Sequence, residues 1–527
     1  MGVKLKNILK TAYDVYPIFN RPMAVCAVMC IAAILYLFNH VGVSYSIFLL
    51  FLIILAVVCA VTRSFKAVVI SVLFLAVCAS ALNEFFKIDE LNRLDGQTVQ
   101  TVFAAVEDST GTEKVSKVTV YAAGDKTIPA NTKFVLYWFD GKKIRCGDKF
   151  KATVKLTSLK DDEYKSYNYG NSVYMNSRLI EINESYKPNA LFSEIGKVRN
   201  YIVSTLDSRF PKSVSSILIA LNTGDRDYLS PEFYEDVLVC GVSHVMVVSG
   251  LHISIILGLF FGLIERVFYN RYLKAVCSLG ILFLIAAMCG FTQSVLRAAL
   301  MFVFFVLAPV FMRRNDPLNS LGAAVVLMLF ISPLCIFSVA FLLSVTSTAA
   351  VVWIAPFYTE LITRRLFIKN RFAVSTVSVF TVSVSAMIFT APVSMSVFNT
   401  VSLLSPVTFL LITFPVTFAL EFNTSALLLS AIPGVRVLSV PLFFISGLCA
   451  RYIRFIVEKL GLLDFMLIKA DIYQFLISLF LIFALINGMY LCKFYRKMLK
   501  RNQLKGVMQH GGNVRGGVEK KPSKRAD

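Results

Sequence analysis

The sequence predicts a polytopic α-helical membrane protein of about twelve spans, within two, with a small extracytoplasmic β-domain inserted after the third span. Charged residues make up only 16% of the 527 residues, and hydrophobic residues make up 57%. A soluble domain would carry about 25% charged residues. Apolar stretches of about 17–25 residues, each long enough to cross a bilayer, recur along the chain. They lie near 22–38, 46–62, 67–82, 240–264, 275–291, 295–311, 318–333, 336–356, 372–398, 403–420, 424–448 and 471–492.

The N-terminal segment 1–82 is expected to hold the first three spans and no cleaved signal peptide. Lysines precede its first apolar run, but the run begins only after Arg21-Pro22 and has no clear small-residue cleavage site. We therefore interpret this run as a retained span.

The net charge of +21 is better explained by membrane topology than by nucleic-acid binding. Most of the excess lies at both chain ends and in alternate short loops, as expected for segments that face the cytoplasm. This rule, that basic residues gather in the segments on the cytoplasmic side, places both termini inside and segment 83–236 outside. Four basic residues fall on the outer side in this scheme: Arg436, Arg451, Arg454 and Lys459. Either the stretch from Arg451 is an amphipathic helix at the interface, or the count of spans is wrong in this region.

Residues 83–195 are expected to form the extracytoplasmic β-domain. Alternating apolar and polar runs, separated by glycine-containing turns, predict about five strands, and that number in about 100 residues suits an OB-like barrel. Such barrels bind single strands through aromatic side chains in a basic groove. Tyr121, Tyr137, Trp138 and Phe139 are candidates, although the segment is nearly neutral. The alternative is a structural cap with these aromatics in its core. The strands are expected at Val99–Val106, Val115–Tyr121, Lys133–Phe139, Lys149–Leu156 and Arg178–Ile182.

Two segments join the β-domain to the second membrane block. Residues 160–176 are polar and rich in tyrosine, which is typical of a surface loop. Apolar residues in 195–222 recur at helical spacing and predict amphipathic linking helices. The membrane block itself is expected to span 196–492. The basic segment 493–527 is expected to be a disordered cytoplasmic tail near the membrane.

Polar residues interrupt the apolar run near 240–264. His244, Ser249, Gly250 and His252 all lie there, and polar residues within the hydrocarbon are candidates for function. Glycine in a span permits close backbone approach or a break in the helix. On a regular helix the two histidines would lie about 80° apart and would share one hydrated face.

These residues resemble a known family. The runs Gly224-Asp-Arg, Gly241-Val-Ser-His and Ser249-Gly-Leu-His are similar to the signature of the ComEC family of competence proteins. Three further stretches follow in the same order as in that family, and the three N-terminal spans and β-domain fit its layout. The stretches are Ser294-Val-Leu-Arg-Ala-Ala-Leu-Met, Arg314-Asn-Asp-Pro-Leu-Asn-Ser-Leu and Phe398-Asn-Thr-Val-Ser-Leu-Leu-Ser-Pro-Val.

The resemblance implies a channel that imports single-stranded DNA across the bacterial cytoplasmic membrane during natural transformation. Arg297 is the best intramembrane candidate for a phosphate contact. The alternative is that Arg297 pairs with Asp316 or Asp225 and holds helices together. His252 has a similar alternative as a packing residue. The positions that match the family motifs are Gly224, Asp225, His244, Ser249, Gly250, His252, Arg297, Asp316 and Pro317.

The chain departs from many relatives in one respect. They carry a C-terminal metallo-β-lactamase-like domain marked by a His-x-His-x-Asp-His cluster, which this sequence lacks. We therefore expect no nuclease, no metal and no cofactor in this chain. The resemblance implies a separate DNA receptor and a cytosolic ATP-driven helicase as partners. A separate nuclease and a second copy of the chain remain open.

Two other functions remain open. An intramembrane enzyme would use Ser249 with His244 or His252, but the sequence shows no oxyanion hole and no third orienting group. A transporter of a small solute or a lipid-linked anion is the second alternative. The chain has no Walker A motif, so ATP-derived force would have to come from a partner.

Overall fold

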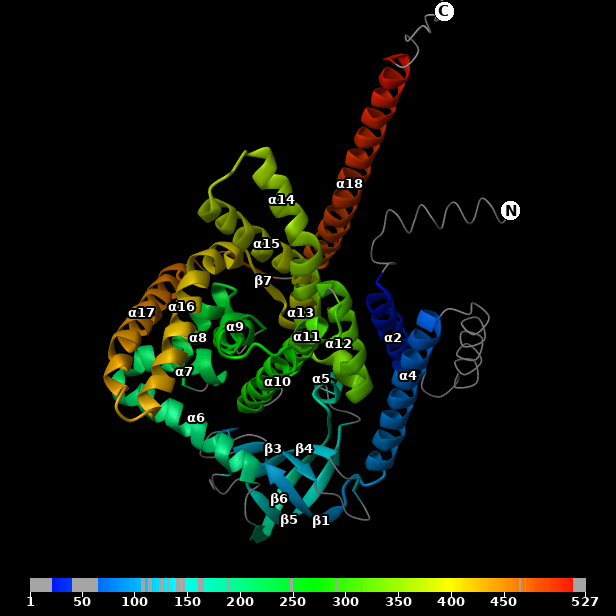
Figure 1. Cartoon of the computed structure of the whole chain (residues 1–527). Helices are drawn as coiled ribbons and strands as arrows, with labels where there is room; N and C mark the ends of the chain where they lie inside the picture. Colours follow the sequence, from blue (N-terminus) through cyan, green and yellow to red (C-terminus); the bar gives the residue numbers. More distant parts are fainter. Residues whose placement is uncertain are drawn as a thin grey trace, which may run out of the picture.

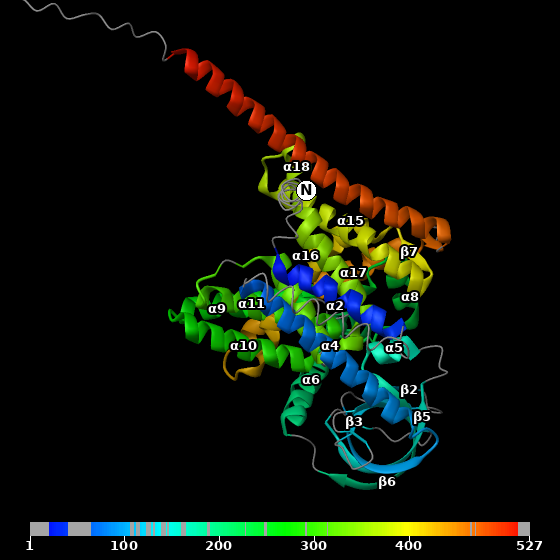
Figure 2. The same ribbon diagram turned by 90° about the vertical axis from the view of Figure 1, so that its right-hand side faces the viewer.

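The computed structural model describes residues 21–39 and 65–514, apart from short gaps between 106 and 189 and at 227, 247–249, 290–291, 314, 464–465 and 470. A block of helices forms most of the molecule, and a small β-barrel lies at one end of it (Figures 1 and 2). The long last helix projects from the opposite end. The expected span 46–62 and the end of the tail lie outside the described residues.

Eight helices in the described part of the chain are long and apolar enough to cross a membrane, and two shorter apolar helices accompany them. A polytopic helical membrane protein with a small β-domain is therefore confirmed, while the count of about twelve spans stays a prediction. The eight are Val69–Asn92, Arg271–Met288, Gln293–Val310, Val339–Arg365, Arg371–Phe398, Ser405–Ala431, Arg436–Gly461 and Ile472–Lys493.

The N-terminal helices pack against the middle of the membrane block. Helices α2 (Pro22–Asn39) and α4 (Phe65–Asn92) share an apolar core with α12 (Pro317–Ile331). Gly322 is required in this contact because a side chain there would collide with the backbone of Ala24. The segment before the β-barrel is thus fixed to the helices that follow it.

The barrel is a closed sheet. The strand order is β1-β5-β6-β4-β3-β2, and β1 also pairs with β3, which closes the ring. Buried residues alternate with partly exposed ones along β4, as expected for strands with one face toward a core. Trp138 lies in that core, so it is no aromatic platform on the surface. The strands are β1 (Thr98–Ala105), β2 (Thr110–Gly111), β3 (Ser116–Ala122), β4 (Thr132–Trp138), β5 (Lys149–Ser158) and β6 (Val173–Tyr186).

A short helix fixes the barrel to the membrane block. Helix α5 (Lys165–Gly170) packs on the 3₁₀ turn η3 (Pro333–Phe337), and Leu334 of that turn enters the barrel core. A side chain at Gly170 would collide with the backbone of Ser338. The expectation of a surface loop over 160–176 is therefore wrong for its described part, where α5 packs on η3 and Tyr169 and Tyr174 are buried in the barrel core. Burial, followed by the Glu84 carboxylate, raises the pKa of Tyr174 above its ordinary value.

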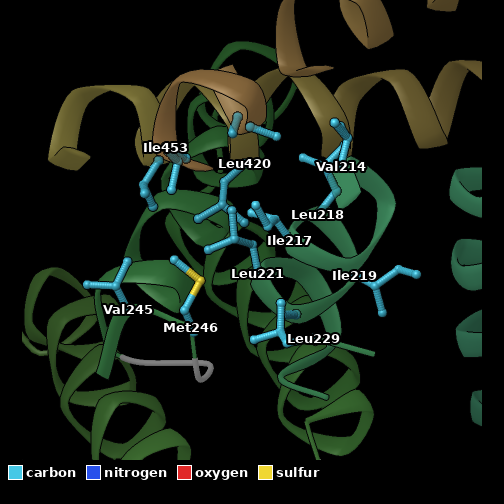
Figure 3. Close-up of a cluster of buried hydrophobic side chains, with 14 of the residues drawn as sticks. Val214, Ile217, Leu218, Ile219, Leu221, Leu229, Val245, Met246, Leu420 and Ile453 are labelled. Carbon is cyan, nitrogen blue, oxygen red and sulfur yellow. The ribbon is translucent and has the colours of Figure 1, made fainter. Parts of the chain in front are cut away.

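Two helices lead from the barrel into the membrane block, as the sequence predicts. Helix α6 (Ala190–Arg209) runs from the barrel to the helical block, and α7 (Lys212–Thr223) is deeply buried in that block. Figure 3 shows Val214, Ile217, Leu218 and Leu221 of this region among other apolar side chains. They belong to a core that also includes residues of α16 and α17, which places the segment just before Gly224 inside the molecule.

The remaining helices form the membrane block, and side-chain caps fix several starts. Asn270 and Asn370 accept hydrogen bonds from backbone amides at the starts of α10 and α15. The elements are α8 (Pro231–Val239), η2 (Ser243–Val245), α9 (Gly250–Val267), α10 (Arg271–Met288), α11 (Gln293–Val310), α13 (Val339–Ala349), η4 (Ala350–Ile354), α14 (Ala355–Arg365), α15 (Arg371–Phe398), β7 (Thr400–Ser402), α16 (Ser405–Ala431), η5 (Arg436–Leu438), α17 (Ser439–Gly461), β8 (Leu467–Lys469) and α18 (Ile472–Val514).

Two expectations near the C-terminus are corrected. The break between the expected spans 403–420 and 424–448 lies at 432–438, where Pro433 lacks an amide hydrogen and Gly434 has a φ of 93°. Residues 451–460 are consequently the last turns of α17 and not a separate interfacial helix. Helix α18 continues to Val514, so the tail is not disordered up to that point. A helix that is already nucleated extends readily through residues such as Leu, Lys, Met and Arg.

Candidate anion site at the start of α9

Arg297 is buried between three helices. It lies in the second turn of α11 and is 7% exposed. Its Nε donates to Ser344 Oγ of α13 at 2.7 Å, and its Nη1 lies 3.6 Å from Met301 Sδ. The Ser344 hydroxyl also lies 3.2 Å from the Ser294 hydroxyl. The guanidinium is therefore held in position by a hydrogen bond to one hydroxyl group and by contact with a methionine thioether.

Gly250 brings the start of α9 against this guanidinium. A Cβ atom at Gly250 would lie 2.9 Å from Arg297 Nη2, closer than such atoms normally approach. Glycine therefore permits the contact that the sequence suggested for this position. Ser249, the residue before it, lies outside the described residues.

Arg297 has no carboxylate partner among the residues that the structure describes. Both acids proposed for it are paired elsewhere: Asp316 with Arg21 at 2.9 Å, and Asp225 with Arg199 at 2.7 Å. The hypothesis that Arg297 pairs with either of them is therefore wrong. A buried guanidinium without a counter-charge is costly, and the positive end of α9 beside it adds to that cost. Both features favour an anion at this point.

Asp316 and Pro317 are structural in their contacts. The Asp316 carboxylate accepts from the backbone amides of Leu318 and Asn319 at 3.1 and 3.0 Å, and Pro317 occupies the first position of α12, where its missing amide hydrogen is harmless. The ion pair with Arg21 then ties α12 to the start of α2. These two residues therefore cap and anchor a helix, away from Arg297.

Gly224 and Asp225 end the buried helix α7. Gly224 has a φ of 80° and donates its amide hydrogen to Ala220 O, a left-handed helix cap that glycine forms without strain. Asp225 follows and binds Arg199 of α6. The pair fixes the turn after α7 to the helix that comes from the barrel.

His244 lies in a loop that two motif stretches build together. Its ring stacks on Phe409 of α16, with centroids 5.8 Å apart. Gly241, with a φ of 67°, accepts from Ser405 Oγ at 3.2 Å, and Ser402 donates to Val239 O at 2.5 Å. The structure thus joins the stretches at 241–244 and 398–407.

The two histidines do not share a helix. His244 belongs to the 3₁₀ turn η2, whereas His252 lies in the first turn of α9 and is fully buried. The expectation that both lie on one face of a single regular helix is wrong, because α9 begins only at Gly250 and His244 precedes it in a separate element.

Comparison with known proteins places this chain in a family. The family model "Competence protein" matches residues 221–494, which is more than half of the chain. The chain belongs to the Competence protein family. It is 25% identical over 182 residues to ComE operon protein 3 of Bacillus subtilis (strain 168), a match that covers 34% of this chain and 24% of that protein. The matched part is thus about a quarter of the length of that relative. No solved structure matches the chain at a significant level.

All nine predicted site residues lie within the matched Competence segment, and eight of them are among the described residues, Ser249 being the exception. The eight form separate groups. Gly250 meets Arg297, and His252 is buried in the same first turn of α9. His244 lies against the segment 398–407, Gly224 and Asp225 form a third group, and Asp316 and Pro317 form a fourth. Among the described residues no cluster of three or more His, Cys, Asp or Glu side chains suits a metal ion.

Sequence reasoning missed two residues in the Competence segment. Ser344 holds Arg297, and its only signal in the sequence was that of a serine at the end of the apolar run Phe341-Leu-Leu-Ser. Glu421 lies well inside α16, and its signal was stronger. It is the only charged residue between Arg371 and Arg436, and an isolated acid within an apolar run is a candidate by default.

Proposed function

We propose that this chain is a membrane channel that imports single-stranded DNA during natural transformation, and that Arg297 contacts the phosphate backbone. The observation that carries the proposal is the buried guanidinium of Arg297, which has no carboxylate partner among the described residues and lies against the start of α9. A guanidinium offers phosphate a planar pair of donors. Membership of the Competence protein family supports the role in DNA uptake.

A channel must also release what it binds, because conduction requires sites that bind weakly enough for the strand to leave them. One guanidinium, helped by the hydroxyls of Ser294 and Ser344, suits a passing contact with one phosphate at a time. A dense row of basic side chains would hold a strand instead. We infer that Arg297 is a transient contact on the route.

The barrel supports the same substrate. Its five longer strands close in the order β1-β3-β4-β6-β5 with β4 and β6 parallel, and this arrangement supports our assignment of an OB-like barrel. Lys117 is paired with Tyr137 and Tyr121 with Lys133 across β3 and β4. Aromatic and basic side chains on one face are typical of single-strand binding, so we propose that this face receives the strand.

The arrangement in Figures 1 and 2 supports an orientation. The barrel and the projecting end of α18 lie at opposite ends of the helical block. We propose that the barrel lies outside the bacterial cytoplasmic membrane and both termini inside, in agreement with the basic segment 493–527. We also propose that a DNA receptor and a cytosolic ATP-driven helicase act with this chain, which is itself no enzyme; whether a separate nuclease takes part stays open.

The alternative function is transport of a small solute or a lipid-linked anion. It uses the same observation, since Arg297 would hold any anionic group that reached it. The two functions differ in what passes: a polymer needs the barrel and the channel in sequence, whereas a small anion needs only the membrane block.

Deletion and restoration of the gene in its native host would test the proposal. We expect transformation frequency to fall on deletion and to return when the chain is supplied again. A host shown to be transformable that transforms equally well without the chain would contradict the DNA-import function and favour the small-anion transporter.

A further inference from the structure

Glu421 lies inside the membrane part of α16. At 1.5 Å per residue it is about 24 Å along the axis from Ser405 and about 15 Å from Ala431, and the hydrocarbon core of a bilayer is about 30 Å thick. A glutamate side chain is too short to bring its carboxylate from there to either surface. Between Arg371 and Arg436 no other residue is charged.

The carboxylate has no counter-charge in the described part of the chain. It is half-buried and forms no ion pair or hydrogen bond with the helices packed against α16, which are α7, α9, α15, η5 and α17. On α17, Arg454 is taken by Glu458, and Arg451 is exposed. The other charged or titratable groups on these elements are Lys212, His252, Glu265, Arg266, Arg371, Arg436, Cys449, Tyr452 and Lys459.

Hydroxyl groups lead to Glu421 along one ridge of α16. Thr413, Thr417, Glu421 and Ser425 follow one another at intervals of four residues and so lie on one ridge of the helix. Thr417 Oγ1 donates to Thr413 O at 2.9 Å, and Thr413 Oγ1 donates to Phe409 O. The ring of Phe409 stacks on the ring of His244. The ridge therefore begins beside the motif segment 241–244.

A polar atom beside Glu421 is buried and unsatisfied in the described structure. Thr424 Oγ1, three residues further along and so next to Glu421 on the helix surface, has no hydrogen-bond partner among the described residues. The fully buried amide of Asn423 is also unsatisfied within this part of the chain, but it lies two residues from Glu421 and so on the opposite side of the helix. Buried groups of this kind are normally satisfied by protein or by ordered water. The turn of α16 around Glu421 is therefore suited to hold water within the membrane.

We propose that Glu421 is a proton-binding site within the membrane. The carboxylate takes up one proton to become a neutral carboxylic acid and releases it again as the carboxylate, with water and the hydroxyl ridge as the route of exchange. An isolated carboxylate in the hydrocarbon is far more costly than the neutral acid, and no basic side chain in the described structure offsets that cost. The proposal goes beyond DNA passage and does not depend on it.

Labelling with dicyclohexylcarbodiimide would test the proposal, because this reagent modifies protonated carboxyl groups in apolar surroundings. The full-length protein in lipid nanodiscs would be treated across a pH series and digested, and the modified peptides measured by mass spectrometry. We expect modification at Glu421, decreasing as the pH rises, and its loss in the Glu421→Gln variant. Glu265, an exposed acid at the end of α9, provides a matched control, and we expect several-fold less modification there.

Three outcomes of the labelling would overturn the inference. One is no modification of Glu421 at any pH in protein that elutes as a single folded species. Another is modification that does not change with pH. The third is protection of Glu421 by sodium ions at constant pH, which would assign the site to a metal cation. Infrared difference spectra that lack a protonated carboxyl band sensitive to Glu421→Gln would argue against it independently of chemical labelling.

Discussion

Two parts of the protein differ in how an arginine is partnered. One is the junction of α2 with α12, and the other is the start of α9. At the junction, Arg21 meets the Asp316 carboxylate at 2.9 Å, and that carboxylate also caps α12. At the start of α9, Arg297 is more deeply buried, yet it has only a hydroxyl and a thioether as side-chain partners in the described structure.

The difference distinguishes a charge that stabilises the fold from a charge that is available to bind a ligand. A paired and capped carboxylate contributes to the folded state and has little left to offer a ligand. An unpaired guanidinium is a cost to the folded state, so its presence is better explained by what it binds. This reasoning selects Arg297 from the nine motif residues and removes Asp316 and Pro317 from the proposed route.

The largest expected effect tests the available charge. Replacing Arg297 with alanine should reduce binding of single-stranded oligonucleotide to the purified protein by at least about thirtyfold, since removal of a buried charge that bonds a ligand costs about 2–5 kcal/mol. Fluorescence anisotropy would measure binding, and transformation frequency should fall in parallel. Arg297→Lys is the matched control, and it should retain part of the affinity because it keeps the charge.

Correct insertion must accompany this result. Membrane fractionation and the elution profile of the variant would show it. Normal uptake by an Arg297→Ala protein that inserts normally would remove Arg297 from the route.

The second effect concerns the close approach at Gly250. A Cβ there would lie 2.9 Å from Arg297 Nη2, so Gly250→Ala should displace the guanidinium, and Gly250→Leu should do so further. We expect a graded loss of oligonucleotide binding, whereas Ser249→Ala should be milder than Gly250→Leu. A larger loss from Ser249→Ala than from Gly250→Leu would instead favour the intramembrane enzyme.

A third effect should appear in stability and not in binding. Asp316→Ala removes a helix cap and a partly exposed ion pair, which together contribute about 1–2 kcal/mol. Thermal unfolding in detergent should occur at a lower temperature, with oligonucleotide affinity unchanged. The exchange of Arg21 and Asp316 should restore the pair but not the cap. A loss of affinity as large as that of Arg297→Ala would show that the junction also belongs to the binding site.

The sequence was sufficient where one physical signal dominates. The expected strand Val99–Val106 is found at Thr98–Ala105, and the expected span 372–398 is α15, because alternation and long apolar runs reflect burial directly. It failed where tertiary contacts decide. Tyr169 and Tyr174 lie in a stretch of polar composition but are buried, Tyr169 in α5, which packs on η3, and Tyr174 in β6. The meeting of Gly250 with Arg297 joins residues far apart in the chain, and no local pattern contains it.

The smallest expected effect concerns Ser344, which positions Arg297 and is not proposed to touch DNA. Its hydroxyl accepts from Arg297 Nε at 2.7 Å, and a single hydrogen bond of this kind contributes about 0.5–1.5 kcal/mol. Ser344→Ala should therefore weaken oligonucleotide binding by no more than about tenfold, and Ser344→Thr, which retains the hydroxyl, should bind nearly as the parent does. In the Arg297→Ala background the Ser344→Ala change should have no further effect on binding, because the hydroxyl acts only through the guanidinium. A further loss in that background would mean that Ser344 meets the ligand itself.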